Sequence, residues 1–511
     1  MAISASVASA KIYDLVVLGA GSGGLEAAYN SAVLHNAKVV VVEPQLHHGP
    51  PLFSALGGTC VNIGCIPKKL MYYAAEERTN RGVSAAMGWK YQQDPHIDWK
   101  ALMQKKDSII SNINESYLGM FRDTPNLELV QGWGVIGNDA KSVKVYDSAP
   151  GEKESLGEAS HHVLQAKNIL VSTGSWPFKP PVEGIEHAIT SNEFFYLPEK
   201  PEKVVIIGGG YIAMEFLCIL HGLGVRETHL IYRGNLPLKG FDVSARTELL
   251  RQLQQRDGMA IHLDDTIQRI APEAGTSLKT ITTQKGTTLS GVECVITCTG
   301  RRPRTNHIGL EDSNIRISPE TGAVLVDKYN RTNVDSVWAV GDVIDRVALT
   351  PVAIHEGRCV AESMFGKTPQ SPEYEYIPKA VFSVPSMASV GMTEEEVIAQ
   401  KMNAEVYMTK FTPLRFNAIP GSDDSHKALF KMIVRSSDKV VVGVHILETA
   451  ASEIIQSVAV CLRMKAKISD FYNTIGLHPS SAEELCSMRE PSYYFVSGEK
   501  CEKLVEDAGK S

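Results

Sequence analysis

Short runs of consecutive apolar residues recur along the first two thirds of the chain, and two of them lead directly into glycine-rich turns. Ile12 to Leu18 precedes Gly19-Ala20-Gly21-Ser22-Gly23-Gly24, and Lys203 to Ile207 precedes Gly208-Gly209-Gly210. Runs without polar alternation are typical of strands buried on both faces of a parallel sheet. Each turn is followed by a helical pattern and a second apolar run, which completes a βαβ unit. The pattern therefore predicts an α/β protein with two Rossmann-like dinucleotide-binding domains.

Three further apolar runs mark where these two domains end. Asn168 to Ser172 and Val292 to Cys298 each lead into Thr-Gly and then into a loop that contains proline. Such loops are typical of the exit from a domain. Ser336 to Val340 precedes Gly341-Asp342, and we expect this run to be a last strand that returns to the first domain.

The pattern changes after Pro372. Val406 to Phe411, Leu429 to Val434 and Val440 to Leu447 have the composition of strands, but no glycine-rich turn follows them. A helical stretch then runs from Ala451 to Lys465. Strands first and helices later are typical of an α+β domain, so we expect a third domain of that class.

Length and charge limit the possible partners. With 511 residues the chain exceeds what one hydrophobic core supports, which agrees with several domains. Its formal net charge of −7 gives no electrostatic reason to expect nucleic acid or an anionic membrane as partner. Val204 to Val225 is nearest in character to a membrane span, but it contains a glycine triplet and Glu215, so we expect no membrane insertion.

Cysteine usage indicates a reducing compartment. Nine cysteines, an odd number, do not fit a fully paired secreted protein. Residues 1–10 lack the apolar core of a signal peptide and the arginine of a transit peptide. We therefore expect a cytoplasmic location.

The first glycine turn has the full dinucleotide fingerprint. Gly19, Gly21 and Gly24 are spaced as G-x-G-x-x-G, and Glu43 ends the next strand about 20 residues further on. The glycines let backbone N–H groups and a helix N-terminus approach a pyrophosphate, and Glu43 would accept hydrogen bonds from a ribose. A plain tight turn is the simpler alternative.

The second turn repeats this device with one change. Gly208, Gly210 and Ala213 carry the spacing, but Arg233 stands where the acid would be, and Lys239 follows six residues later. A guanidinium at that place suits a 2′-phosphate, so we expect the second site to prefer NADPH over NADH. Alternatively, Arg233 is a solvated surface residue.

Cys60 and Cys65 have four residues between them and stand among glycines at an expected helix start, with Lys68 close behind. The helix N-terminus and the lysine would lower the pKa of a thiolate, and a small ring closed by these cysteines is readily reduced and re-formed. Metal ligation is the rival interpretation. No second pair at zinc spacing accompanies the cysteines, so we expect a redox pair and no metal.

Near the C-terminus, His478 is followed five residues later by Glu483. Thiol exchange needs an acid that protonates the departing sulfur, and an imidazole supported by a carboxylate supplies one near neutral pH. A lone histidine is more often a surface or core residue, and His478 is a candidate only because of its neighbours.

With these motifs, the chain resembles the pyridine nucleotide–disulfide oxidoreductases over essentially its whole length. The cysteine box with Lys68-Lys69, both fingerprints, Gly341-Asp342 and the segment from His478 to Glu483 carry the resemblance. It implies an FAD-binding domain interrupted by an NADPH-binding domain, and then an interface domain that makes a homodimer. The implied boundaries are 1–180 and 304–375 for the FAD-binding domain, 181–303 for the NADPH-binding domain and 376–511 for the interface domain.

The resemblance also implies a role for each motif residue. Cys65 lies against the flavin and Cys60 attacks the substrate, while His478 and Glu483 reach the cysteines from the other subunit. Lys68 and Glu215 pair beside the flavin, Asp342 binds its ribityl chain, and Tyr211 covers the flavin until NADPH enters. The remaining implied cofactor contacts are Ser22, Thr59, Thr173, Gly174, Gly300 and Thr350.

Residues implied for the substrate pocket separate two branches of this family. Members that reduce trypanothione disulfide, a cationic substrate, have an acid where this chain has Glu26, and Met120 also matches them. Tyr29 departs from their usual tryptophan, and Arg358 is an arginine that glutathione reductases carry. Glu484 is a further implied contact. We expect trypanothione disulfide as the substrate, with glutathione disulfide or dual specificity as the alternative and a non-catalytic flavoprotein as a more distant one.

Overall fold

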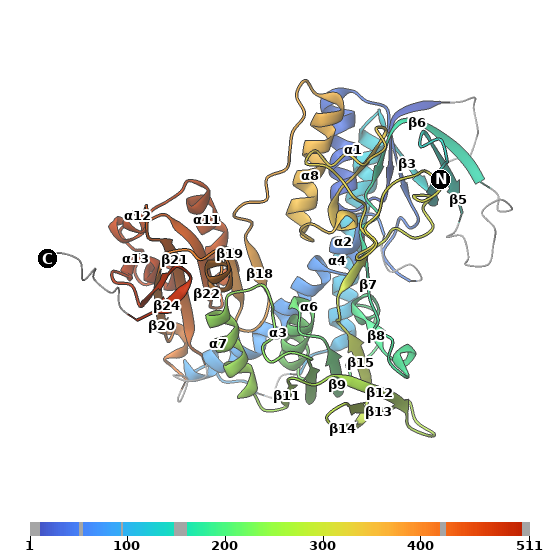
Figure 1. The fold of residues 1–511 in the computed structure, drawn as a ribbon. Coiled ribbons are helices and arrows are strands. Elements are labelled where there is room, and N and C mark those ends of the chain that lie inside the picture. Colours follow the sequence, from blue (N-terminus) through green and yellow to red (C-terminus); the bar gives the residue numbers. More distant parts are fainter. Residues whose placement is uncertain (1–10, 51–54, 93–95, 148–160, 420–425, 503–511) are drawn as a thin grey trace.

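The computed structural model describes residues 11–50, 55–92, 96–147, 161–419 and 426–502. The first ten residues, on which the expected location partly depends, lie outside these ranges. Three main sheets organise the described chain, and each is covered by helices (Figure 1). None of the helices in these ranges combines the length and the apolar character that a bilayer span requires.

The first sheet has seven strands in the order β3-β2-β1-β6-β5-β4, with β17 paired to β6. Strands β3, β2, β1, β6 and β17 pair in parallel, whereas β5 pairs with β6 and β4 pairs with β5 in antiparallel fashion. The predicted return of Ser336 to Val340 to the first domain is confirmed by β17. Helices α1 and α8 lie side by side over one face of this sheet (Figure 1). The bounds are β1 Ile12–Leu18, β2 Val39–Glu43, β3 Leu127–Gln131, β4 Trp133–Ile136, β5 Ser142–Tyr146, β6 His161–Val171, β17 Val337–Ala339, α1 Ser22–His35, α8 Thr350–Phe365 and the 3₁₀ turn η2 Gly341–Ile344.

The second sheet repeats this plan in the order β11-β10-β9-β15-β8, and all of its pairings are parallel. The apolar run predicted from Val292 to Cys298 contains β15, but its first residue, Val292, ends β14 because the chain bends at Glu293. A small antiparallel sheet, β12-β13-β14, adjoins it. The bounds are β8 Ile189–Thr190, β9 Lys203–Ile207, β10 Glu227–Ile231, β11 Met259–His262, β12 Ile267–Pro272, β13 Lys279–Thr283, β14 Thr288–Val292, β15 Cys294–Thr297, η1 Ile185–His187, α5 Ser191–Phe194, α6 Tyr211–Gly222 and α7 Val243–Gln254.

Two short antiparallel strands connect these domains. β7 (Ser175–Pro177) leaves the first domain and pairs with β16 (Arg301–Pro303), which returns from the second. Both follow the Thr-Gly pairs at which domain exits were predicted.

The third sheet is antiparallel throughout, in the order β18-β19-β22-β21-β20-β23-β24, with α11 to α13 packed beside it (Figure 1). The predicted α+β class is confirmed, but the sequence analysis missed the last hairpin. Its strands are short and lie at the sheet edge, where the hydrophobic pattern is weak. The bounds are β18 Lys379–Val381, β19 Met387–Gly391, β20 Ala404–Phe411, β21 Ala428–Arg435, β22 Val441–Leu447, β23 Tyr493–Val496, β24 Glu499–Cys501, α9 Glu394–Ala399, α11 Ala451–Arg463, α12 Ile468–Asn473, α13 Glu484–Ser487, η3 Leu414–Phe416 and η4 Ser481–Glu483.

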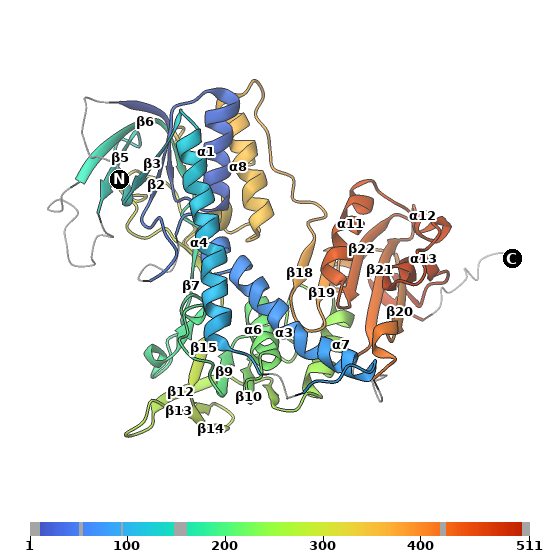
Figure 2. The same ribbon diagram turned by 180° about the vertical axis from the view of Figure 1, so that it is seen from behind.

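The cysteine segment occupies the junction of the three sheets. It forms α2 (Gly58–Asn62) and the start of α3 (Cys65–Ala86), and α4 (Trp99–Asp123) runs along the back from the first sheet towards the second (Figure 2). Helix α3 packs on α6 so closely that a Cβ on Gly222 would lie 2.7 Å from the Cβ of Ala75. This contact holds the cysteine helix against the second dinucleotide fold.

Candidate active site

The first glycine turn forms a cradle with no room for side chains. A Cβ on Gly19 would lie 2.7 Å from the carbonyl oxygen of Ser172, and Gly19 has a φ of +100°. Gly58, at the start of α2, approaches Gly21 just as closely, since its Cβ would lie 2.7 Å from the Gly21 Cα. Such bare backbone at the start of α1 is what a pyrophosphate requires.

Glu43 lies at one end of the cavity beside this turn. Its carboxylate accepts a 2.7 Å hydrogen bond from the Ala20 N–H, and burial raises its pKa to about 7. A buried acid that faces a cavity is stabilised by hydroxyl donors, as a ribose supplies. The predicted Gly19, Gly21, Thr59, Thr173 and Gly174 line the same cavity. These residues therefore fit the adenosine end of FAD.

The sequence analysis did not name two polar or aromatic residues that line this cavity. Trp133 and Arg304 both face it, and the Arg304 guanidinium lies 4.9 Å from the centre of a Trp133 ring. Neither belongs to a motif, so only the fold could reveal them.

The residues predicted for the flavin end come from separate segments. Asp342, in η2, accepts a 2.7 Å hydrogen bond from the Ser175 hydroxyl, which in turn accepts one of 2.8 Å from Arg301. Tyr211 begins α6, and Gly300 leads into β16 with a φ of +117°. Thr350 begins α8, and its hydroxyl lies 3.7 Å from the Cys65 sulfur.

The two cysteines are free thiols held on consecutive helices. Cys60 lies in α2 and is partly buried, while Cys65 is the first residue of α3 and is exposed. Asn62, at the end of α2, donates to the carbonyls of Ala55 and Gly58 at 3.0 and 2.9 Å and so holds α2 against the segment that leads into it. A hydrogen bond from the Cys60 thiol, then Thr350 and Lys68, lower the pKa of Cys65 to about 6 against an opposing desolvation, and the pKa of Cys60 is raised in turn. The proton that the two sulfurs share is therefore held more tightly by Cys60 than by Cys65.

Lys68 and Glu215 form the predicted ion pair. The Lys68 ammonium lies 2.8 Å from the Glu215 carboxylate, and their side chains are only 12% and 3% exposed. Glu215 also accepts a 2.9 Å bond from the Phe382 N–H, and Lys68 lies 4.3 Å from the centre of that phenyl ring. Phe382 thus contacts both members of the ion pair, and the sequence analysis did not name it.

An open cleft exposes Cys60 to solvent. Its lining includes the predicted Ser22, Glu26, Tyr29 and Met120, together with Tyr117 and Ile113, which the sequence analysis did not name. Most of these side chains come from two helices, α1 and α4. A small molecule in this cleft would thus lie against Cys60.

Arg358 does not line this cleft itself, but it pairs with Glu26, which does. Its guanidinium lies 2.5 Å from the Glu26 carboxylate of α1, although Glu356 and Glu362 are its neighbours in α8. Glu356 instead accepts from the Gly341 N–H and the Tyr374 hydroxyl, and Glu362 pairs with His35. Asn30 also donates to Glu26 at 3.0 Å.

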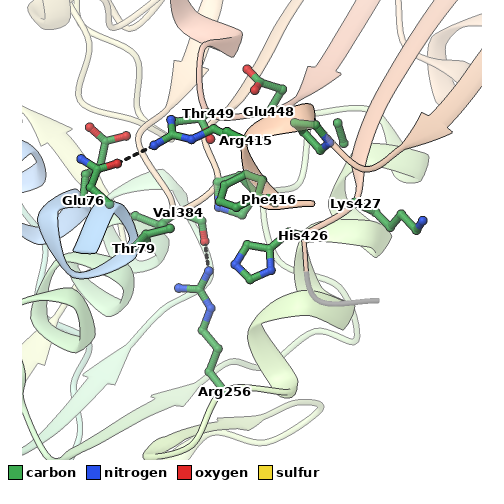
Figure 3. Close-up of a pocket in the computed structure, with 14 residues that line it drawn as sticks. Glu76, Thr79, Arg256, Val384, Arg415, Phe416, His426, Lys427, Glu448 and Thr449 are labelled. Carbon is green, nitrogen blue, oxygen red and sulfur yellow. Dashed lines mark hydrogen bonds between the residues drawn. The ribbon is translucent and has the colours of Figure 1, made fainter. Parts of the chain in front are cut away.

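A separate cavity lies between α3 and the third sheet (Figure 3). It is lined by Arg256, Arg415 and His426, among others, and the His426 ring lies 4.4 Å from that of Phe416. Within the described ranges, no residue predicted for catalysis or cofactor binding lines it.

His478 and Glu483 pair with each other but not with the cysteines of the same chain. The Nδ1 of His478 lies 3.0 Å from Glu483, and its side chain is 82% exposed. Helices α12 and α13, between which His478 stands in the chain, lie away from α2 (Figure 1). Ile475 and Leu477, just before it, are 96% and 78% exposed. Glu484, predicted for the substrate, accepts from Ser487 in α13.

The second glycine turn adjoins the loop with the predicted phosphate contacts. Gly208 and Gly210 lead into α6, and Arg233 and Lys239 are both exposed on the loop after β10. The N–H of Leu238 donates to the Gly209 carbonyl at 2.7 Å, which places Lys239 beside the glycine turn.

Sequence comparison agrees with this arrangement. Residues 13–357 match the pyridine nucleotide-disulphide oxidoreductase family, and residues 377–489 match its dimerisation domain. The chain belongs to this family. Members use FAD and NADPH, and the residues above fit both.

Relatives of this oxidoreductase share nearly its whole length. It is 44% identical to the trypanothione reductase of Trypanosoma congolense, over 98% of this chain and 99% of that protein. It is 38% identical to the glutathione reductase of Burkholderia cepacia, over 93% and 98%. A flavoprotein disulfide reductase from Escherichia coli has the same fold, with a TM-score of 0.78 at 24% identity and coverage of 93% and 99%. The chain is thus an NAD(P)H-dependent flavoprotein disulfide reductase.

The low pKa of Cys65 predicts how alkylation of this oxidoreductase depends on pH. Its thiolate dominates above pH 6 and is lost below, so the iodoacetamide rate at Cys65 should fall about tenfold per pH unit below that value. Thr350→Ala should raise the midpoint, because it removes one donor to the thiolate. Thr276→Ala, far from the pair, should not. Peptide mass spectrometry of the reduced protein measures the rate. A wild-type midpoint near the ordinary thiol value of about 8.5 would contradict the shared proton.

Proposed function

We propose that this oxidoreductase reduces a low-molecular-weight disulfide with NADPH, and that its substrate is trypanothione disulfide. The observation that carries this proposal is the cleft in which the Cys60 sulfur and the Glu26 carboxylate face the same space. An acid there attracts a cationic disulfide and repels an anionic one. The identity of 44% with trypanothione reductases, against 38% with a glutathione reductase, supports the same order.

Bound FAD supplies the chemistry that links NADPH oxidation to reduction of the cysteine pair. The ion pair of Lys68 with Glu215 supports a fixed positive charge beside Cys65, which stabilises the thiolate. Cys60 keeps the shared proton, so a base must remove it before Cys60 can attack. His478 of a second subunit is our candidate, because in a single chain it is exposed and remote from Cys60.

Exchange then proceeds in two displacements. The Cys60 sulfur attacks one sulfur of the substrate and forms a mixed disulfide, while His478 returns its proton to the departing thiolate. The Cys65 thiolate next attacks the Cys60 sulfur, which closes the Cys60–Cys65 disulfide and releases the second substrate thiolate. That thiolate takes a proton from solvent. Two thiols leave for each disulfide consumed.

The contact between Arg358 and Glu26 favours a second candidate, an enzyme of dual specificity. Arg358 is 61% exposed and offsets part of the acid's charge. It would also attract the carboxylates of glutathione disulfide. In solvent such a pair changes binding by only about 1 kcal/mol, so the expected effect is modest.

Replacing Arg358 with alanine should therefore sharpen the preference for the cationic disulfide. We expect the ratio of kcat/KM for trypanothione disulfide over glutathione disulfide to rise by about 3- to 10-fold, because Glu26 is freed and one cation is lost. NADPH consumption with each disulfide measures it. Arg226→Ala, which removes an equally charged surface residue far from the cleft, should leave the ratio unchanged. Better turnover of glutathione disulfide by the wild type would contradict the proposed substrate.

We also propose that the active protein is a homodimer with shared active sites in the cytoplasm. The matched dimerisation domain and the exposed Ile475 and Leu477 support the dimer, and the odd number of cysteines supports the location. We keep the boundaries 180, 303 and 375 as our proposal for the FAD, NADPH and interface domains.

A further inference from the structure

The loop that carries Arg233 and Lys239 is held along its length. Leu238 is 3% exposed and has a φ of +63°, and its N–H donates to the carbonyl of Gly209. The Phe241 N–H donates back to the Leu238 carbonyl at 3.1 Å. These two hydrogen bonds fix the end of the loop near α7 and connect the loop to the glycine turn. The distance between Arg233 and Lys239 therefore depends on the position of the loop.

Arg246, in the first turn of α7, forms hydrogen bonds with the same loop. Its Nε donates to the Pro237 carbonyl at 2.7 Å and one Nη to the Leu236 carbonyl at 2.8 Å. Its other Nη lies 3.1 Å from Glu395, in α9 of the third domain, and the arginine side chain is only 10% exposed. A planar guanidinium with fixed donor directions transmits such a contact better than a lysine would. Arg246 thus connects the loop to the third domain.

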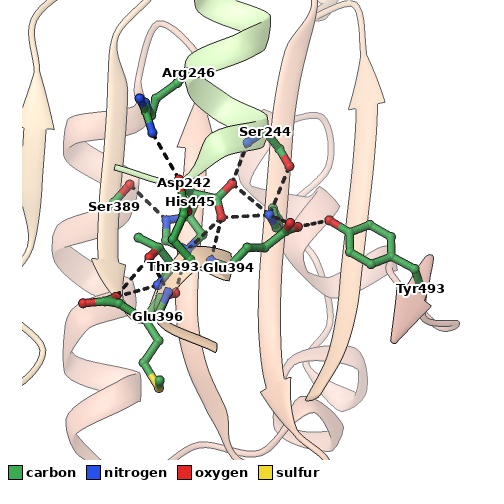
Figure 4. Close-up of polar contacts among 12 residues, drawn as sticks. Asp242, Ser244, Arg246, Ser389, Thr393, Glu394, Glu396, His445 and Tyr493 are labelled. Carbon is green, nitrogen blue, oxygen red and sulfur yellow. Dashed lines mark hydrogen bonds and ion pairs between the residues drawn. The ribbon is translucent and has the colours of Figure 1, made fainter. Parts of the chain in front are cut away.

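Asp242, at the base of the loop, makes a second connection of the same kind (Figure 4). It caps α7 by accepting from the Ser244 N–H, and both of its oxygens lie 2.8 Å from the Lys431 ammonium of β21. Lys431 also contacts Glu394, which Tyr493 reaches from β23. The side chains of Asp242 and Lys431 have no exposed area.

A buried ionic cluster of this kind specifies geometry more than it stabilises. Taking Asp242 and Lys431 out of water is unfavourable, and their mutual attraction roughly offsets this cost. Burial on its own would raise the pKa of Asp242, but His445 and Lys431 hold it below its usual range. The cluster therefore fixes the position of the loop base relative to β21 and α9.

We propose that the third domain positions the NADPH-binding loop, with Glu395 acting through Arg246 and Lys431 acting through Asp242. The inference rests on the proposed second nucleotide site, in which Arg233 and Lys239 receive the 2′-phosphate. These four are positioning residues, since they touch the loop or each other and not the nucleotide. The domain that matches the family's dimerisation domain thereby takes part in cofactor selection.

Arg246→Met tests this arrangement with a probe that requires no turnover. Titration calorimetry with 2′,5′-ADP on the FAD-loaded protein should show binding weakened by about 3- to 10-fold, because two bonds to the loop are lost. The KM for NADPH should rise by a similar factor, whereas kcat and the KM for the disulfide should stay within about twofold. Glu395→Gln keeps the loop bonds and removes only the negative charge from the interdomain contact. This substitution should weaken the binding of 2′,5′-ADP by about twofold. Because Glu395 is exposed, the substitution should leave the stability of the fold nearly unchanged.

Lys410→Met is the matched control. Lys410 of the third domain pairs with Glu248 of α7 at 3.0 Å, further along the helix from the loop. Its loss should leave 2′,5′-ADP binding unchanged. Equal weakening by Lys410→Met would mean a general loosening and overturn the inference. The inference would also be overturned if Arg246→Met and Glu395→Gln both bound 2′,5′-ADP as the wild type does while Arg233→Ala bound it weakly. Unchanged binding in Arg233→Ala as well would instead overturn the proposed nucleotide site, and the inference with it.

Discussion

Replacing Cys60 with serine is expected to lower disulfide-dependent NADPH consumption by at least about 10³-fold. The Cys60 sulfur is the one that lines the open cleft, so no other thiol of the site can take its place. Cys65→Ser should be as severe, because the mixed disulfide would then have no resolving thiolate. Steady-state assays with a saturating disulfide measure both losses.

Cys461→Ser is the matched control for these variants. Cys461 is also a partly accessible thiol, but it lies in α11 of the third domain. Full activity is expected after its replacement. Substantial turnover by Cys60→Ser would show that the disulfide is reduced elsewhere.

Replacing His478 with glutamine is expected to lower kcat by about 10²- to 10⁴-fold, the usual contribution of a general acid–base. Reduction of the cysteine pair by NADPH should keep its rate, because His478 acts only on the substrate half of the cycle. Rapid-mixing absorbance of the flavin separates the two halves. His187→Gln removes another histidine paired with a glutamate, Glu186, and should have no effect.

Mixed dimers sharpen this prediction. A hybrid of Cys60→Ser with His478→Gln subunits contains one intact site if the histidine acts across the interface. Random reassociation of equal amounts should therefore restore about one quarter of wild-type activity. If the histidine served its own chain, every site in the hybrids would be damaged and no activity would return.

Local patterns explain why much of the fold could be predicted. Buried strands followed by glycine turns can be recognised in a sequence, because burial and a positive φ each restrict the residue type over a few positions. The runs at Ile12 and Lys203 became β1 and β9 with the predicted bounds. Cys60, Cys65 and Lys68 lie within one short segment that forms the consecutive helices α2 and α3, so their proximity follows from their spacing in the sequence.

Contacts between distant segments could not be predicted in this way. Arg358 and Glu26 meet because α8 packs on α1, and the sequence alone left the partner of Arg358 open. Phe382 supports Glu215 through its backbone N–H, which any residue type could supply. Lys431 reads as an interruption of an apolar strand until Asp242 and Glu394 are seen beside it. Each of these depends on how domains pack, and periodicity carries no information about that.

Labelling of Cys60 and Cys65 before and after NADPH most directly tests whether electrons pass through this pair. The anaerobic, FAD-loaded protein is alkylated, and each cysteine is quantified by peptide mass spectrometry. We expect both to resist alkylation in the oxidised protein, to react after one equivalent of NADPH, and to close again when the disulfide substrate is added. Labelling of Cys60 and Cys65 that is the same with and without NADPH would contradict their role as the redox centre.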